Sequence, residues 1–158
     1  MCIRDSNTAV DKVIEANTLL SGIGFESGGL ALAHAIALAY PEIEFIHDHY
    51  LHGEMVAMGT LAQLAMEDSG DAERVTRFFA RIGLPVHFAQ ISFEPDNLEA
   101  MNKLIEATLA RPIAHNMPMP VTKDSLTEAL FNAHELGLKI ATDAVSYTHL
   151  TLPTRLSV

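Results

Sequence analysis

The chain has 158 residues with 10 Lys and Arg against 20 Asp and Glu, which gives a formal net charge of −10 at pH 7. The acidic balance argues against nucleic acid or an anionic membrane as a partner, although solubility alone accounts for it. A hydrophobic content of 49% with mixed charges is typical of one globular domain. The single cysteine, Cys2, excludes an internal disulfide and favours a reducing, cytoplasmic compartment.

Both ends of the chain differ from its middle. Residues 1–6 (MCIRDS) and 145–158 (VSYTHLTLPTRLSV) do not continue a helical pattern and resemble translated sequencing-adapter sequence. An ordinary extended tail is the alternative. We therefore expect residues 7–144 to be the natural segment, a helical domain truncated upstream, and we expect neither a signal peptide nor a membrane-spanning segment.

The first expected helix runs over Thr8–Leu20, where apolar residues recur at helical spacing. The SGIGF sequence at Ser21–Phe25 predicts its end. Gly22, Gly24 and Gly28 have a superficial likeness to a dinucleotide-binding loop, but no strand precedes them and their spacing differs. Close packing between helices is the preferred explanation of these glycines.

The next segment, Gly28–Tyr40, has no charged residue over thirteen positions, which predicts a buried helix. His34, in its middle, needs a polar partner because an unpaired buried polar group costs about 1–3 kcal/mol. A second helix is expected over Gly53–Asp68, directly after His52. Glu54 lies in its first turn, where a carboxylate suits the helix dipole.

The remainder of the chain reads as helices joined by short connections. Strand signals are nearly absent, so the fold class predicted is an all-α helical bundle whose short helices depend on tertiary packing. The further expected elements are a helix at Ala72–Arg81, an extended link at Val86–Phe93, a helix at Pro95–Leu109, a proline-rich loop at Arg111–Pro120 and a helix at Thr122–Leu136 stopped by Gly137.

Histidines are the strongest candidates for chemistry. His34 and His52 each lie among small apolar residues, and two neutral imidazoles on packed elements form a usual half of a zinc or iron site. They are eighteen residues apart, and from that spacing alone two satisfied core histidines are the stronger reading. His47, Asp48 and His49, together with His52, offer an alternative site on a loop.

The other histidines have weaker claims. His115, in the proline-rich loop, could line a pocket, but a structural role is the stronger reading. His87 and His134 look like surface or boundary residues. Ser21 and Ser27 have no base at the spacing of a nucleophile motif, so nucleophilic catalysis is not expected.

Three strings in the chain resemble a known family. EANTLLSGIGFESGGLALAHAI, HGEMVAMGTLAQLAME and IAHNMP are similar to the C-terminal helical domain of the glycerol dehydrogenase family. That family belongs to the iron-containing (group III) alcohol dehydrogenases, which share a fold with dehydroquinate synthase. The resemblance covers nearly all of residues 7–144.

The resemblance implies a function and a set of residues. His34 and His52 match the two histidine ligands of a Zn²⁺ or Fe²⁺ ion, and the third ligand, an aspartate, and the α/β NAD-binding domain are expected upstream. Phe25–Ser27 and His115–Met117 resemble segments near the active-site cleft. The implied reaction is NAD-linked oxidation of glycerol or a similar alcohol to a carbonyl compound, in a full-length homo-oligomer. The alternatives are a non-catalytic metal-binding fragment and another alcohol or hydroxy-acid dehydrogenase of the superfamily.

Overall fold

The computed structural model describes residues 8–43, 46 and 49–149, with side chains described up to residue 143. The chain divides into two compact units, Met1–Leu30 and Ala31–Val158, and each is described by itself. All the regular structure in the described part of the chain is helical. The prediction of an all-α fold is therefore confirmed.

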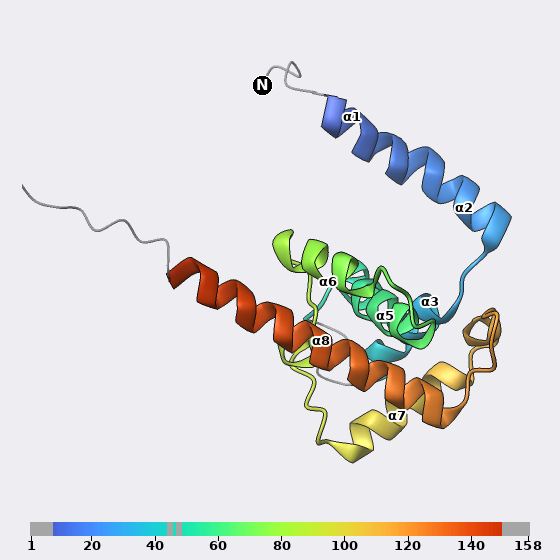
Figure 1. Cartoon of the computed structure of the whole chain (residues 1–158). Coiled ribbons are helices and arrows are strands. Elements are labelled where there is room, and N and C mark those ends of the chain that lie inside the picture. Colours follow the sequence, from blue (N-terminus) through green and yellow to red (C-terminus); the bar gives the residue numbers. More distant parts are fainter. Residues whose placement is uncertain (1–7, 44–45, 47–48, 150–158) are drawn as a thin grey trace, which may run out of the picture. The chain divides into compact units, whose positions relative to one another are not determined.

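Unit 1 contains one uninterrupted helical run (Figure 1). It consists of α1 (Thr8–Glu15), a π-helical turn η1 (Ala16–Leu20) and α2 (Ser21–Gly28). In the π turn the Ser21 hydroxyl donates to the carbonyl of Asn17 at 2.6 Å, so the side chain supports the backbone there. The run stops at Gly29, whose φ of +70° favours glycine.

The predicted break at Ser21–Phe25 is wrong, because those residues form α2. Gly22 and Gly24 lie inside this helix, where each costs up to about 1 kcal/mol relative to alanine without preventing a helix. No described atom of unit 1 would lie within 4 Å of a Cβ at either glycine, so this unit does not supply the close packing expected for them. A helical setting also excludes the strand-to-helix turn of a dinucleotide loop, as the spacing indicated.

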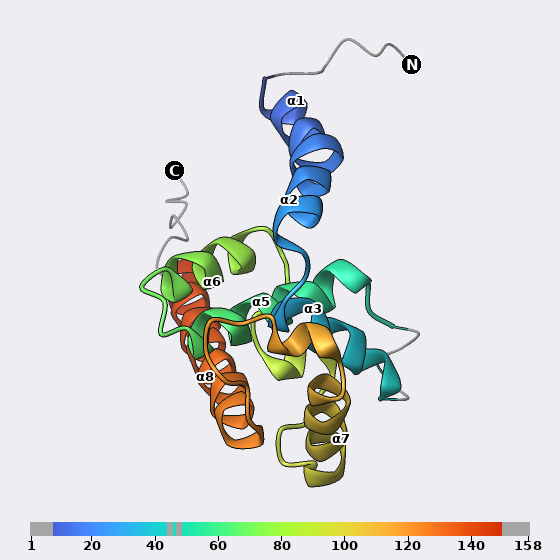
Figure 2. The same cartoon turned by 90° about the vertical axis from the view of Figure 1, so that its right-hand side faces the viewer.

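Unit 2 is a bundle of five α-helices and three 3-10 turns in its described part (Figure 2). These α-helices overlap the segments that the sequence predicted to be helical; α6 has the predicted bounds, and α7 begins at Leu98 and not at the predicted Pro95. The elements are α3 (Leu32–Ala39), η2 (Tyr40–Glu42), α5 (His52–Met66), α6 (Ala72–Arg81), η3 (Phe88–Ile91), α7 (Leu98–Leu109), η4 (Pro112–His115) and α8 (Lys123–His149).

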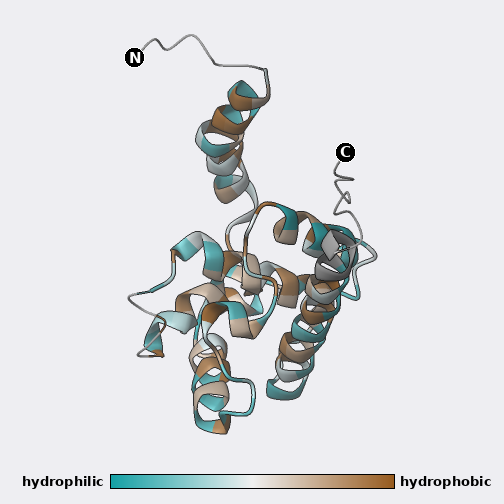
Figure 3. Cartoon of the chain, turned by 90° about the vertical axis from the view of Figure 1, so that its left-hand side faces the viewer, coloured by the Kyte–Doolittle hydropathy of each residue, from teal (hydrophilic) through white to brown (hydrophobic). Residues whose placement is uncertain are grey.

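The core of unit 2 lies where α3 and α5 pack together and α7 and α8 pack against them. Figure 3 shows hydrophobic and hydrophilic bands alternating along these helices, as expected for elements with one buried side. The largest fully buried side chains are those of Tyr40, Phe88, Phe93, Leu32, Ile36, Ile46, Ile91, Leu104, Ile105, Leu126, Leu130 and Val86.

The last helix begins as predicted but ends differently. At its start the Thr122 hydroxyl accepts a bond from the Ser125 N–H at 3.2 Å, which is a side-chain cap. The predicted stop at Gly137 is wrong, because α8 continues to His149. A Cβ at Gly137 would lie 1.7 Å from the Val86 carbonyl oxygen. Glycine is present there so that the connection after α6 can approach the helix.

The proline-rich segment is fixed by Arg111, which joins three elements. Its guanidinium donates to the Ala107 carbonyl at the end of α7, to the Leu38 carbonyl of α3 at 2.8 Å, and to the Glu42 carboxylate at 2.7 Å. Each carbonyl belongs to a last helical turn, where cations are stabilising. Arg111 therefore holds the C-terminal ends of α3 and α7 together.

The connections are more regular than predicted. The link Val86–Phe93, expected to be extended, contains the 3-10 turn η3, and the loop Arg111–Pro120 contains η4. Among the described residues no single helix has the length and hydropathy of a membrane span; the run Thr8–Gly28 and the segment Leu32–Glu42 reach them only when taken together.

Candidate metal centre

His34 and His52 lie on the two helices that pack most extensively, α3 and α5. His52 lies at the start of α5, as predicted, although the helix includes it and the predicted helix began one residue later, at Gly53. Glu54 in the first turn of α5 accepts a bond from the Leu51 N–H at 2.7 Å, which fixes the backbone where the helix begins. The position of His52 is therefore set by a helix start that the sequence itself specifies.

The position of His34 differs from the prediction. It lies in the first turn of α3, not in the middle of a helix, because α3 begins at Leu32. Residues 29–31, directly before α3, are not helical: Gly29 has φ +70° and ψ −157°, and Ala31 is extended. The expected helix Gly28–Tyr40 is thus shortened at its N-terminal end, and His34 lies near the same end of the α3–α5 pair as its partner.

The structure brings the two imidazoles together. Their ring centroids are 5.9 Å apart with an angle of 51° between the ring planes. The His34 ring is partly buried, and this burial, with a smaller contribution from the charge of His52, lowers the pKa of His34. His34 is therefore neutral at pH 7, which is the form that binds metals.

The separation of the two rings fits a shared divalent cation. An imidazole nitrogen binds zinc at about 2.0–2.1 Å, which puts the centroids of two rings on one tetrahedral ion roughly 5 Å apart, so the observed 5.9 Å requires only a small shift of the rings. In the part of the chain that the structure describes, no cluster of three or more His, Cys, Asp or Glu residues could hold a metal ion. His34 and His52 are therefore a pair of imidazoles without a third such residue in the described part of the chain, and their role as ligands stays a prediction.

The alternative site on the loop before α5 stays a prediction. His47 and Asp48 lie outside the described residues, and His49 is exposed. His52 belongs to both alternatives, so the position of this residue does not distinguish them. The ring-to-ring approach of His34 and His52 is the geometry that favours the pair on α3 and α5.

The two segments that resemble cleft residues have ordinary helical surroundings. Phe25–Ser27 lies within α2 and is not a turn. His115 is exposed at the end of η4, and its Nε2 is 3.1 Å from the Leu109 carbonyl oxygen at the end of α7. This contact is of the kind expected for a structural role, and the choice between that role and a pocket-lining one stays a prediction.

His134 is not the surface or boundary residue that the sequence indicated. It is only 9% exposed, its Nδ1 accepts a bond from the Phe88 N–H at 3.1 Å, and its ring stacks on that of Phe88 with centroids 4.7 Å apart. The half-buried His87 lies beside it, with ring centroids 6.2 Å apart. Burial, and then the charge of His87, lower the pKa of His134, while Glu135 opposes this effect.

This environment predicts acid lability. The folded state binds a proton on His134 less readily than the unfolded chain does, so its contribution to stability is complete above the unfolded pKa of about 6.5 and is lost as the pH falls towards the lower folded pKa. His134→Asn keeps an acceptor for the Phe88 N–H without a titrating ring. We expect the free energy of unfolding of this variant, measured in urea between pH 7.5 and 5, to fall less steeply on acidification than that of the parent. The two slopes should differ by at most the uptake of about one proton on unfolding, which is about 1.4 kcal/mol per pH unit.

The comparison at pH 7.5 serves as the control, since His134 is neutral there and any difference reports packing alone. Identical slopes for the parent and the variant would contradict the assignment. His34 and His87 also have lowered pKa values, so some acid lability remains in the variant.

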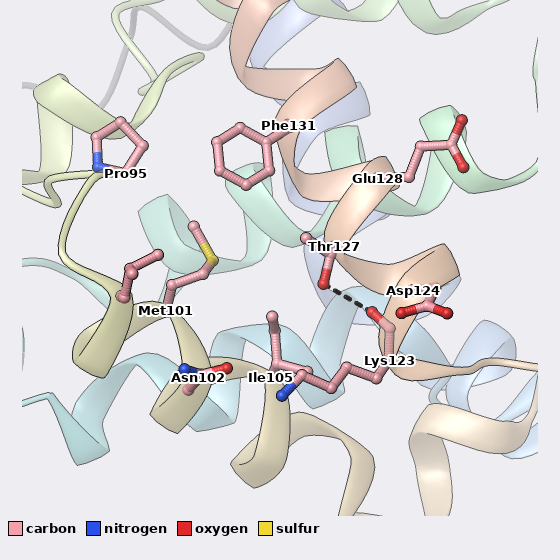
Figure 4. A pocket seen from close by; sticks show the side chains of 10 residues that line it. Pro95, Met101, Asn102, Ile105, Lys123, Asp124, Thr127, Glu128 and Phe131 are labelled. Atoms are coloured by element: carbon pink, nitrogen blue, oxygen red, sulfur yellow. Dashed lines mark hydrogen bonds between the residues drawn. The ribbon is translucent and has the colours of Figure 1, made fainter.

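A hollow of about 470 Å³ lies between α7 and α8 (Figure 4). Met101 and Ile105 of α7 face Phe131 of α8 across it, and Lys123 of α8 extends towards Ile105. Its described lining contains no histidine. The hollow is therefore separate from the candidate metal centre.

Sequence reasoning missed Gln63 and Gly59, which fix α3 against α5. Ala33, the residue before His34, donates its N–H to the Gln63 Oε1 at 3.0 Å. A Cβ at Gly59 would lie 2.1 Å from the Ala33 carbonyl oxygen. The HGEMVAMGTLAQLAME string contains both positions, but nothing local in the sequence indicates that their partner lies near residue 33.

Comparison with known proteins supports the helical reading. No protein-family model matches the chain. It is 44% identical over 132 residues to glycerol dehydrogenase of Citrobacter freundii, covering 82% of this chain and 36% of that protein, and 39% identical over 135 residues to glycolaldehyde reductase of Halobacterium salinarum, covering 84% and 37%. The chain thus spans little more than a third of the length of these curated relatives.

Solved structures give the same result. A glycerol dehydrogenase from Schizosaccharomyces pombe superimposes with a TM-score of 0.79 at 34% identity, over 89% of this chain and 37% of that one. A probable glycerol dehydrogenase from Sinorhizobium meliloti gives 0.75 at 34% identity, over 86% and 38%. The chain corresponds to the all-helical C-terminal domain of the iron-containing alcohol dehydrogenase fold. Within that class it belongs to the glycerol dehydrogenase family.

Proposed function

We propose that the protein containing this chain catalyses metal-dependent, NAD-linked oxidation of glycerol, or of a similar vicinal diol or alcohol. The observation that supports this proposal most directly is the approach of the His34 and His52 rings, 5.9 Å apart, in a chain of the glycerol dehydrogenase family. In this proposal His34 and His52 hold one Zn²⁺ or Fe²⁺ ion, and an aspartate outside this chain completes the ligand set.

Each histidine contributes through its position. His34 stays neutral at pH 7 because burial lowers its pKa, so its ring nitrogen is available as a ligand. His52 is held at the start of α5 by the contact between the Leu51 N–H and Glu54. When bound, the cation supplies Lewis-acid stabilisation of negative charge on the alcohol oxygen. These residues orient the secondary hydroxyl of the substrate for oxidation.

The overall reaction balances as a two-electron oxidation. A hydride leaves the secondary carbinol carbon of glycerol for NAD⁺, the hydroxyl proton is released, and the products are dihydroxyacetone and NADH. NAD⁺ is bound mainly by residues outside this chain, because the glycines of unit 1 lie in helix α2 and do not form a phosphate-binding loop. The full-length protein is proposed to act as a homo-oligomer.

A second substrate has support from one relative. The 39% identical protein of Halobacterium salinarum is a glycolaldehyde reductase, and reduction of a small hydroxyaldehyde is the reverse type of reaction on a two-carbon substrate. Both substrates place a hydroxyl beside the reacting carbon. The same pair of histidines therefore serves either reaction.

The test uses the coding sequence of this chain expressed with whatever flanks it in its genome. NADH formation from glycerol is followed with a chelator, without it, and after zinc or ferrous ion is added back. We expect a rate that the chelator removes and metal restores. NADH consumption with glycolaldehyde, or NADH formation from another alcohol but not from glycerol, would assign a different substrate within the same family. No rate with any of them would contradict the enzymatic proposal and favour a non-catalytic metal-binding fragment.

A further inference from the structure

The first turn of α3 has a helix start without a local cap. The residue before the helix is Ala31, whose side chain offers no acceptor, and no side-chain cap bond forms there. The first N–H groups of a helix need partners from elsewhere. One of them, the N–H of Ala33, donates to the Gln63 Oε1, thirty residues away in α5. His34 is the next residue along the chain.

The same turn is held a second time by the backbone of α5. Gly59 lies one helical turn before Gln63, on the same side of α5, and its Cα is so close to Ala33 that a Cβ would lie 2.1 Å from the Ala33 carbonyl oxygen. Both polar backbone atoms of Ala33 thus face α5. The position of Ala33 relative to α5 is therefore fixed at two points, at Gln63 and at Gly59.

The amide of Gln63 is itself oriented by a second contact. Its Nε2 donates to the Glu67 Oε1 at 2.9 Å, which leaves Oε1 directed towards the Ala33 N–H. If the amide were rotated by half a turn, two donors would face each other and a carboxylate would face a carbonyl oxygen. An acceptor oxygen on residue 67, which Glu supplies and Gln can also supply, therefore determines which end of the Gln63 amide meets α3.

We propose that Gln63 is a positioning residue for the metal centre, and this inference rests on the proposed function of His34 and His52. Helix α5 contains His52 at its first position and Gln63 eleven residues later, about 16 Å along the axis. The helix therefore connects His52 rigidly to Gln63, whose side chain binds Ala33, the residue before His34. Gln63 sets the His34–His52 separation by binding Ala33.

The proposal separates a positioning role from simple capping. A cap that contributes only to stability lowers the free energy of unfolding equally with and without bound metal when it is removed. It leaves the metal affinity of the folded protein unchanged. A positioning residue changes metal affinity at a temperature where the variant is fully folded. Loss of groups that orient metal ligands typically lowers affinity by about 10–100-fold.

The experiment compares three variants of the protein expressed with its flanking coding sequence. Gln63→Leu removes the acceptor and keeps the side chain's approximate size. The exchange Gln63→Glu with Glu67→Gln restores an acceptor for Ala33 and an amide-to-carboxylate contact with the roles reversed. Glu67→Gln alone keeps the acceptor on residue 63 and is the matched control. Zinc affinity is measured by competition with a chromophoric chelator, and hydrogen exchange is measured by mass spectrometry on the peptide that contains α3.

We expect zinc affinity to fall about tenfold or more in Gln63→Leu, with faster exchange in the first turn of α3, and to return in the exchanged pair. Glu67→Gln should resemble the parent within a few-fold. Parental zinc affinity in a folded Gln63→Leu variant would overturn the proposal, whatever its exchange rate. If the parent itself binds no zinc, the metal assignment of the proposed function fails. Hydrogen exchange in the first turn of α3 then tests only whether Gln63 holds Ala33, and an unchanged exchange rate in Gln63→Leu would overturn that contact as well.

Discussion

The variants His34→Ala and His52→Ala are each expected to abolish metal-dependent turnover in the full-length protein while the helical domain stays folded. Each removes one of the two imidazoles whose rings are 5.9 Å apart. The loss should exceed the roughly 10–100-fold that removal of an outer ligand-orienting group typically costs, because each variant removes a proposed ligand itself. The measurement is the rate of NADH formation from glycerol at saturating zinc, with circular dichroism to check the helices.

Two further variants sharpen this prediction. His49→Ala tests the alternative site on the loop, since a loss as large as that of His52→Ala, with activity kept in His34→Ala, would place the metal there. His87→Gln is the control, because that half-buried ring lies beside His134 and not in the pair. Activity retained in both His34→Ala and His52→Ala would reject the ligand assignment.

The second large effect concerns stability, at the glycines where backbones touch. Gly59→Ala puts a Cβ 2.1 Å from the Ala33 carbonyl oxygen, and Gly137→Ala puts one 1.7 Å from that of Val86. In both cases the obstacle is backbone, so a whole segment must shift. Overpacking of this kind typically costs about 1–3 kcal/mol. For a chain of this length, the melting temperature should fall by roughly 3–10 °C.

Gly53→Ala provides a matched control in the same helix as Gly59. No described atom lies within 4 Å of a Cβ at Gly53, so alanine there should be neutral or should stabilise by up to about 1 kcal/mol through its helix propensity. Thermal unfolding followed by circular dichroism compares the three variants. A Gly59→Ala melting temperature equal to that of Gly53→Ala would show that α3 and α5 do not cross as closely as described.

The helices themselves were largely predictable, because hydrophobic periodicity is a local property. The bounds of α6 followed from that pattern, and the start of α5 was predicted to within one residue with the help of Glu54. The glycines were not predictable in the same way. Gly137 looked like a helix stop, yet it serves an approach by Val86, a residue some fifty positions earlier in the chain. A glycine in the sequence does not indicate which of these two needs it meets.

The candidate centre shows the same division between local and distant information. A spacing of eighteen residues gave little reason to pair His34 with His52, and only the resemblance to a family did so. Their proximity depends on how α3 and α5 cross, which involves Gly59 and Gln63. The burial of His134 was missed for a similar reason, since its partner is the Phe88 N–H in a distant turn.

The Arg111 guanidinium forms a fork by binding the carbonyls of Ala107 and Leu38 together, and this fork limits where residues can be inserted into the domain. These bonds join the end of α7 to the end of α3, so the rotation of α7 about its own axis is fixed relative to α3. One residue inserted inside α7 would rotate everything after it by about 100° around the helix axis and carry the guanidinium away from Leu38. Insertions after Arg111, in contrast, leave the fork in place. Length variation among natural relatives should therefore gather in the proline-rich loop and avoid α7.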